Sequence, residues 1–189
     1  IISLEKEQYL LEFMNEIKFN DSRDEIYDFI KKVYLNGKDS IENISFEILF
    51  GDGRDFLKTM KGIKFDAVFQ DPFSPSKNPE MWSVEYFSCL KNLMTDKAIL
   101  TTYSSADQIR RAMLEAGLIL GAGPSVGRKR EGTIASKSAV FEILDNERIG
   151  IIMDNPKSEP YRDKELSMKR DDILSERLEK IRNKKTKIR

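Results

Sequence analysis

One carboxylate, Asp71, stands where a short apolar stretch gives way to a proline-rich one. Residues 65–69 are apolar except for Asp66, which predicts a buried strand that ends just before Asp71. The three prolines of residues 72–79 exclude regular strand pairing and predict a rigid, irregular loop. Ligands of open α/β sheets bind beyond the carboxyl ends of the strands, so Asp71 is a candidate site residue. The alternative is that Asp71 only caps the following turn.

Two further acids follow predicted strands. Residues 1–4 predict a strand end with Glu5 at its tip, and residues 44–50 predict a strand that runs into Gly51-Asp52-Gly53. Such glycines let a ligand approach the backbone closely, although an ordinary turn is an equal alternative. In doubly wound folds a carboxylate after the second strand commonly grips a ribose, and an acid after the third can meet an adenine amino group. The set of three acids predicts an adenosine-containing cofactor.

The remaining elements alternate in a way that supports this arrangement. Helical spacing of apolar residues and the intervening apolar runs predict helices at about 6–17, 22–36, 53–60, 80–93 and 104–117, and strands at 98–103, 118–120 and 138–144. Strands that alternate with helices at this spacing are typical of a parallel, doubly wound α/β sheet.

Composition limits the possible functions. The 189 residues are 40% hydrophobic, which is enough for one sizeable core. The sequence has no histidine and one cysteine, so we expect no metal site, no His-based catalytic triad and no disulfide framework. The absence of a membrane-spanning run and of a signal peptide predicts a protein with no membrane partner, in the reducing cytoplasm.

Charge divides the chain unevenly. Residues 156–189 hold twelve Lys and Arg against seven Asp and Glu, whereas residues 1–155 hold twenty against twenty-five. We therefore predict a domain at 1–155 and a basic, amphipathic helical tail at 156–189. Such a tail can contact a polyanion, although a solvated helix face is the commoner explanation.

At this point the residues resemble a known family. The run Asp66-Ala-Val-Phe-Gln-Asp-Pro-Phe-Ser-Pro-Ser-Lys-Asn-Pro-Glu-Met-Trp82 is similar to the methyltransferase that completes 5-methylaminomethyl-2-thiouridine at the tRNA wobble position, the MnmC-like family. Further similar runs are Thr102-Tyr-Ser-Ser-Ala106, Arg110-Arg111 and Gly127-Arg-Lys-Arg-Glu131. The tail from Pro160 resembles the branch that lacks the fused FAD oxidoreductase.

The resemblance implies a Rossmann-like class I fold and N-methylation of an aminomethyl group on uridine, with S-adenosyl-L-methionine as the cofactor. It implies that Glu5 holds the ribose, that Asp52 between its two glycines meets the adenine, and that Asp71 with Pro72 lies at the reacting end. Methyl transfer from a sulfonium needs an uncharged amine held in line, and Asp71 can orient that amine by accepting its hydrogen bonds. Whether Asp71 also removes a proton depends on its pKa. Phe73 would pack against the acceptor base, with ordinary core packing as the alternative for Phe73 and Trp82.

A tRNA substrate implies phosphate and nucleoside contacts. The candidate substrate-binding residues are Lys77, Asn78, Trp82, Arg110, Arg111, Arg128, Lys129 and Arg130. Each of the cations alone is more often a solvated surface charge, but as a set they predict an RNA surface. An upstream tRNA-modifying enzyme is a possible partner that hands over the substrate.

One feature departs from the family. The glycine-rich loop that follows the family's first strand is absent, because the sequence starts at the position of the second strand, with Ile1. We therefore interpret the sequence as N-terminally truncated and expect it to bind S-adenosyl-L-methionine weakly or not at all.

Two other functions stay open. Aminopropyltransferases of the spermidine synthase type share the fold and the Gly-Asp-Gly turn, but they lack the Asn-Pro-Glu-Met-Trp run seen at residues 78–82. A non-catalytic RNA-binding module is the second alternative. A nicotinamide-dependent oxidoreductase is disfavoured, because no G-x-G-x-x-G run follows a strand.

Overall fold

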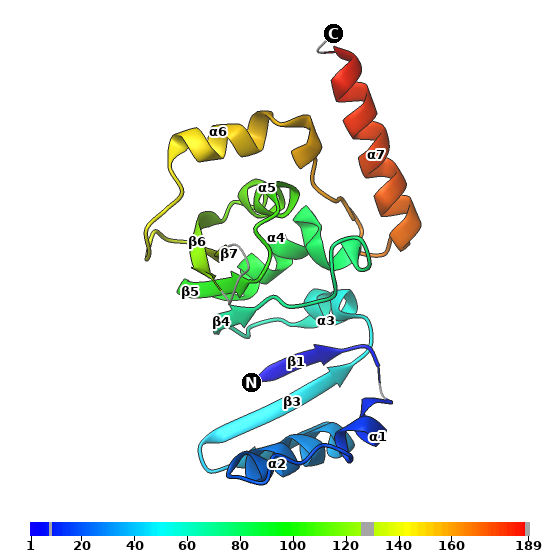
Figure 1. Ribbon diagram of the computed structural model, residues 1–189, viewed down its shortest axis with the longest axis vertical. Coiled ribbons are helices and arrows are strands. Elements are labelled where there is room, and N and C mark those ends of the chain that lie inside the picture. The colour runs from blue at the N-terminus through cyan, green and yellow to red at the C-terminus, as the bar shows by residue number, and fades with distance from the viewer. Residues whose placement is uncertain (8, 126–130, 188–189) are drawn as a thin grey trace. The chain divides into compact units, whose positions relative to one another are not determined.

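The structure is a computed structural model that describes residues 1–7, 9–125 and 131–187 (Figure 1). It divides into two compact units, residues 1–59 and residues 60–189. Each unit has its own sheet and helices. The two units are described separately below.

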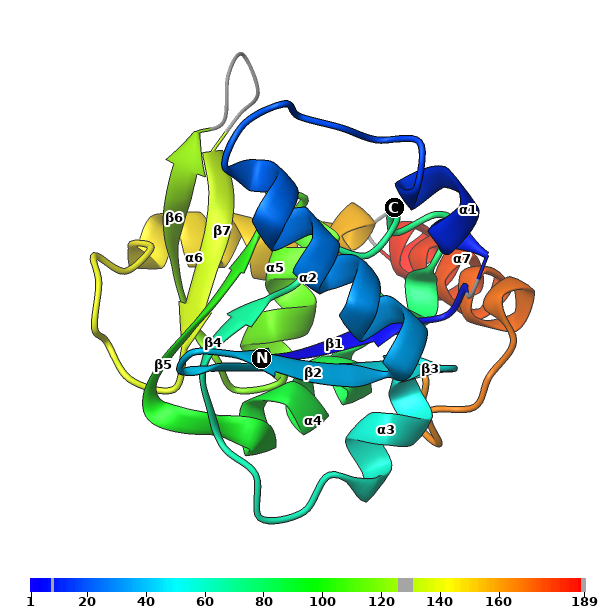
Figure 2. The ribbon, with the colours of Figure 1, turned by 90° about the horizontal axis from the view of Figure 1, so that it is seen from below.

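Unit 1 is built on a three-stranded sheet in the order β1-β3-β2. Its strands are β1 (Ile2–Glu5), β2 (Lys38–Ile41) and β3 (Ile44–Phe50), and its helices are α1 (Leu10–Met14), α2 (Arg23–Asn36) and α3 (Gly53–Thr59). Strands β1 and β3 run parallel, whereas β2 pairs with β3 as an antiparallel hairpin. Helix α2 packs along β2 and β3, as Figures 1 and 2 show.

The core of unit 1 lies between α2 and the sheet. Val33 and Tyr34 on the last turns of α2 are buried against Ile48 of β3. The helix ends at Gly37, whose φ of 80° reverses the chain into β2. This packing holds β3 in place, and β3 in turn fixes the direction in which the Gly51-Asp52-Gly53 turn leaves the sheet.

Unit 2 is built on a four-stranded sheet in the order β4-β5-β7-β6. Its strands are β4 (Phe65–Phe69), β5 (Met94–Thr102), β6 (Ile119–Ser125) and β7 (Glu131–Ser136), and its first helices are η1 (Pro79–Trp82), α4 (Val84–Leu93) and α5 (Asp107–Glu115). Strands β4 and β5 pair in parallel, and β7 is antiparallel to both of its neighbours. Alternate residues of β5, Ala98 and Leu100, are buried, whereas Ile99 between them is 40% exposed.

The C-terminal segment belongs to unit 2. Its elements are α6 (Asn146–Asp154), η2 (Pro156–Ser158) and α7 (Arg170–Lys187). Tyr161 forms an isolated bridge with Ser83, and Arg162 pairs with Glu85 at 3.3 Å and also with Glu115. These contacts tie the segment to α4 and α5. The observed division of the chain therefore lies between residues 59 and 60, whereas the charge pattern placed a boundary between 155 and 156.

The α/β class is confirmed, but the arrangement of the strands differs from the expected parallel sheet. The sheets are mixed and form two separate groups. The expected strand at 138–144 is wrong. In the part of the chain that the structure describes, the last strand is β7, which the sequence did not predict because glycines lie around it. Residues 138–144 instead lie beside β6, where a Cβ on Gly121 would come within 2.6 Å of the carbonyl oxygen of Glu142. Within the described residues, no helix is long and apolar enough to cross a membrane.

Candidate active site

Asp71 lies beyond the carboxyl end of β4, as the sequence predicts. The amide of Gln70 donates to the carbonyl oxygen of Thr101 at 2.9 Å, so the pairing with β5 continues to the residue before Asp71. The Asp71 side chain is exposed, and the ring of Phe73 is 72% exposed. The strand end therefore presents a carboxylate and an aromatic ring, two residues apart, to any molecule that approaches it.

The loop after Asp71 is held by its own hydrogen bonds. The amides of Lys77 and Asn78 donate to the carbonyl oxygen of Ser74 at 2.7 and 3.0 Å. Helix η1 follows at once and ends at Trp82, which is 0% exposed. The indole Nε1 of Trp82 donates to the carbonyl oxygen of Phe73 at 3.0 Å. The expectation that Trp82 contacts substrate is thus corrected: it is a core residue that binds the backbone of the loop.

The structure adds Tyr103 to the site, although the sequence predicted no role for this residue. Its hydroxyl donates to the carbonyl oxygen of Pro72 at 3.1 Å. Burial raises the pKa of the Tyr103 phenol, and the negative charge of Asp71 raises this pKa further. The signal for this role in the sequence is the position of Tyr103 at the end of the strand predicted at 98–103, one residue beyond the observed end of β5.

In unit 1, two of the predicted acids share one edge of the sheet. Glu5 is the last residue of β1 and lies opposite Phe50, the last residue of the parallel strand β3. The amide of Gly51 donates to the carbonyl oxygen of Glu5 at 2.8 Å, which continues the ladder into the turn. One carboxylate oxygen of Glu5 accepts the amide of Glu7 at 2.9 Å. The other oxygen has no donor among the described residues, as a ribose-binding carboxylate requires.

Asp52 is engaged by a neighbouring cation. The Arg54 guanidinium binds both of its carboxylate oxygens, at 2.7 to 3.2 Å, and the amide of Arg54 donates to one of them at 3.0 Å. The hydrogen bonds from the Arg54 side chain hold the pKa of Asp52 below its usual range, partly opposed by burial. Asp52 is therefore ionised at neutral pH.

The turn around Asp52 suits a nucleoside. Gly51 has a φ of 143°, a conformation that L side chains rarely adopt. Carboxylate oxygens have lone pairs beyond those that Arg54 uses, so Asp52 keeps the capacity to accept from an amino group. The two carboxylate acceptors, Glu5 and Asp52, together with Gly51 and Gly53, therefore fit the adenosine half of the expected cofactor.

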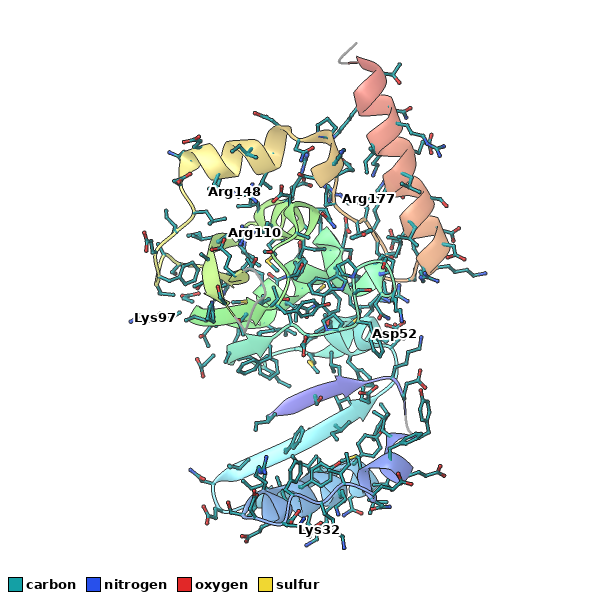
Figure 3. The ribbon with its side chains drawn as sticks, in the orientation of Figure 1. Lys32, Asp52, Lys97, Arg110, Arg148 and Arg177 are labelled. Atoms are coloured by element: carbon teal, nitrogen blue, oxygen red, sulfur yellow. The ribbon has the colours of Figure 1, made fainter. Side chains whose placement is uncertain are left out.

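The two arginines of α5 both have hydrogen-bond partners within the protein, but they differ in burial. Arg110, which Figure 3 labels, is 2% exposed. Its guanidinium donates to the Thr133 hydroxyl, the Gly132 carbonyl and the Glu131 carboxylate. Because breaking these bonds would leave buried partners unsatisfied, Arg110 is a structural residue and its assignment to substrate is wrong. Arg111 is likewise occupied, by Glu115 at 2.8 Å and by the Met153 carbonyl at 2.9 Å. These two contacts are partly or fully exposed, so the assignment of Arg111 to the substrate stays a prediction.

Lys77 and Asn78 remain candidates for substrate contact. Lys77 is exposed in the loop that follows Asp71. Asn78 is half-buried, and its amide nitrogen donates to Glu80 at 3.3 Å, while its Oδ1 has no hydrogen-bond partner among the described residues. The other predicted cations, Arg128, Lys129 and Arg130, lie outside the described residues.

Comparison with known proteins identifies the class of enzyme. The model of a family described as S-adenosyl-L-methionine-dependent methyltransferase matches residues 19–138, more than half of the chain. The chain belongs to this family. The description of the family names methyl transfer as its activity and S-adenosyl-L-methionine as its cofactor.

Individual relatives narrow the class. The chain is 33% identical over 166 residues to an uncharacterised protein of Methanocaldococcus jannaschii, with 85% of this chain covered. It is 31% identical over 176 residues to the tRNA 5-methylaminomethyl-2-thiouridine biosynthesis bifunctional protein MnmC of Leptospira interrogans, with 82% of this chain covered. The crystal structure of MnmC2 from Aquifex aeolicus matches 97% of this chain with a TM-score of 0.80 and 31% identity.

These relatives are longer than the chain. The chain spans 46% of the archaeal protein, 26% of the Leptospira protein and 58% of the Aquifex chain. The similarity to MnmC thus concerns its methyltransferase portion, and the match confirms the Rossmann-like methyltransferase fold.

Proposed function

We propose that this methyltransferase methylates the aminomethyl group of 5-aminomethyl-2-thiouridine at the wobble position of tRNA. The observation that carries the proposal is the pair Asp71 and Phe73, exposed at the end of β4 on a turn whose backbone is bound by Trp82. The similarity to MnmC supports the choice of substrate.

The residues of this turn suit the chemistry. The bound cofactor supplies an activated methyl group, and the acceptor must be a neutral amine whose lone pair points along the line of transfer. The Asp71 carboxylate would accept hydrogen bonds from the amine and set its direction, which is where most of the rate enhancement in such a displacement arises. The exposed Phe73 ring would stack on the uracil, and Pro72 would border the reacting end.

We further propose that the adenosine half of the cofactor binds along the unit 1 sheet edge. Glu5 would accept from the ribose hydroxyls, Asp52 would accept from the adenine amino group, and Gly51 and Gly53 would let the cofactor approach the backbone. These roles are supported by the shared edge of β1 and β3 and by the ionised state of Asp52.

For the tRNA, we propose phosphate contacts by Lys77, Arg128, Lys129 and Arg130, with Asn78 near the acceptor nucleoside. A tRNA substrate implies action in the cytoplasm, and its aminomethyl group must be supplied by an upstream modifying enzyme.

The test is a transfer assay on the protein at its full natural length. The enzyme receives labelled S-adenosyl-L-methionine and tRNA that lacks only the final methyl group, and tRNA that already carries it serves as the control. We expect label in the wobble nucleoside of the first tRNA only. A parallel reaction receives decarboxylated S-adenosylmethionine and putrescine. Label-free tRNA in the first reaction and spermidine in the second would assign the protein to the aminopropyltransferases. tRNA binding without either product would indicate an RNA-binding module.

Weak cofactor binding by the 189-residue sequence itself stays a prediction. Calorimetric titration with S-adenosyl-L-methionine checks it, with the natural full-length protein as reference. Equal affinities would refute it.

A further inference from the structure

Two aromatic side chains bind consecutive carbonyl groups of the Asp71-Pro72-Phe73 turn. The Tyr103 hydroxyl donates to the Pro72 carbonyl at 3.1 Å, and the Trp82 indole donates to the Phe73 carbonyl at 3.0 Å. The Pro72 ring already restricts its own φ. The two hydrogen bonds therefore hold the Pro72-Phe73 and Phe73-Ser74 peptide groups, and Asp71 directly precedes this held segment.

The two donors also support each other. Their rings meet edge to face, with centroids 5.8 Å apart and an interplanar angle of 87°. Trp82 is fully buried, so the protein core restricts its ring, whereas Tyr103 is 45% exposed. Tyr103 directly follows β5, whose Thr101 pairs with Phe69 of β4. Parallel pairing therefore brings Tyr103 beside the Asp71 turn.

We propose that Tyr103 is a positioning residue for methyl transfer, whose hydrogen bond to the Pro72 carbonyl sets the direction of the Asp71 carboxylate toward the acceptor amine. The inference rests on the proposed function and adds a residue to it. A tyrosine phenol is protonated at neutral pH, and the raised pKa of Tyr103 keeps it a donor under alkaline conditions as well. A displacement of the carboxylate by about 1 Å is enough to slow a positioned reaction by as much as about a hundredfold.

The decisive variant is Tyr103→Phe in the full-length protein, since it keeps the ring against Trp82 and removes only the donor. We expect kcat to fall by about tenfold, with the KM for S-adenosyl-L-methionine and the melting temperature unchanged. Tyr27→Phe, which removes a phenol oxygen from α2 in unit 1, is the matched control and should retain the wild-type kcat.

Testing Tyr103→Phe in a protein that also carries Asp71→Asn distinguishes a positioning role of Tyr103 from a merely structural one. If Tyr103 acts through the Asp71 carboxylate, Tyr103→Phe should lower kcat much less in an Asp71→Asn protein than in wild type. Equal losses in both backgrounds, or a wild-type kcat for Tyr103→Phe, would overturn the inference while leaving the proposed function intact. If the wild-type protein transfers no methyl group to aminomethyl tRNA, the proposed function fails and this inference fails with it.

Discussion

The indole nitrogen of Trp82 lies 3.0 Å from the carbonyl oxygen of Phe73, nine residues earlier in the same loop. This bond joins the buried end of the loop to its exposed end, because Trp82 is fully buried and Phe73 is 72% exposed. The core of unit 2 thereby fixes the backbone from which Asp71 and Phe73 project.

Replacing Trp82 with Phe should therefore affect stability and transfer together. The substitution removes the indole donor and leaves a small cavity, so we expect the free energy of unfolding to fall by about 1–3 kcal/mol. We also expect slower methyl transfer, because the Phe73 carbonyl loses its partner. Denaturant unfolding and the tRNA assay measure the two effects.

The matched control is Phe87→Leu. Phe87 is fully buried, and its ring centroid lies 6.4 Å from that of Trp82, but it leaves the loop hydrogen bond in place. It should lower stability to a similar degree with a smaller loss of transfer. If both variants slow transfer equally, the hydrogen bond has no special role.

Arg110 and Lys77 should separate stability from tRNA binding. Arg110→Met leaves the buried Thr133 hydroxyl and Gly132 carbonyl without their donor, so we expect a loss of about 2–4 kcal/mol in unfolding free energy. Lys77→Met should leave stability unchanged. For tRNA binding, it should reduce the slope of log K against log salt concentration by about one. An unchanged salt slope for Lys77→Met would remove Lys77 from the phosphate surface.

Acid should weaken unit 1 through Asp52. Arg54 lowers the pKa of Asp52 from its ordinary value of 3.8, so the ion pair stabilises the folded state at every pH above that value. This stabilisation is lost as the pH falls from about 4 through the lower folded-state pKa, because the unfolded chain then binds the proton more readily. The titration of the Asp52 carboxyl carbon by NMR measures the pKa directly. In Arg54→Met it should move up toward 3.8, and an unmoved midpoint would contradict the pairing.

The sequence predicted the strand ends better than the sheet. Periodicity and glycine turns located β1, β3, β4 and β5, and with them Glu5, Asp52 and Asp71, because strand length and the breaking residues are local properties. Pairing partners are not local. Strand β7 lies antiparallel between β5 and β6 because of contacts across the sheet. The spacing of apolar residues within 131–136 does not indicate this position.

The charged residues show the same limit. In the sequence, Arg110 and Lys77 are both simply basic residues. In the structure, Arg110 is buried and hydrogen-bonded to three neighbours, whereas Lys77 is exposed. Arg110 falls in the helix that the sequence predicts at 104–117, but only the packed structure shows that its guanidinium is buried. Tyr103 was missed for a related reason, since its partner is a backbone carbonyl and leaves no trace in residue types.

The most direct test of the account is single-turnover methyl transfer to aminomethyl tRNA by Asp71→Asn, with Asp66→Asn as the control. Both positions are exposed carboxylates near β4, but Asp66 lies within the strand and accepts a hydrogen bond from Thr95. We expect Asp71→Asn to slow transfer by about a hundredfold or more, and Asp66→Asn to react at the wild-type rate. Wild-type transfer by Asp71→Asn would contradict the central claim that this carboxylate orients the acceptor amine.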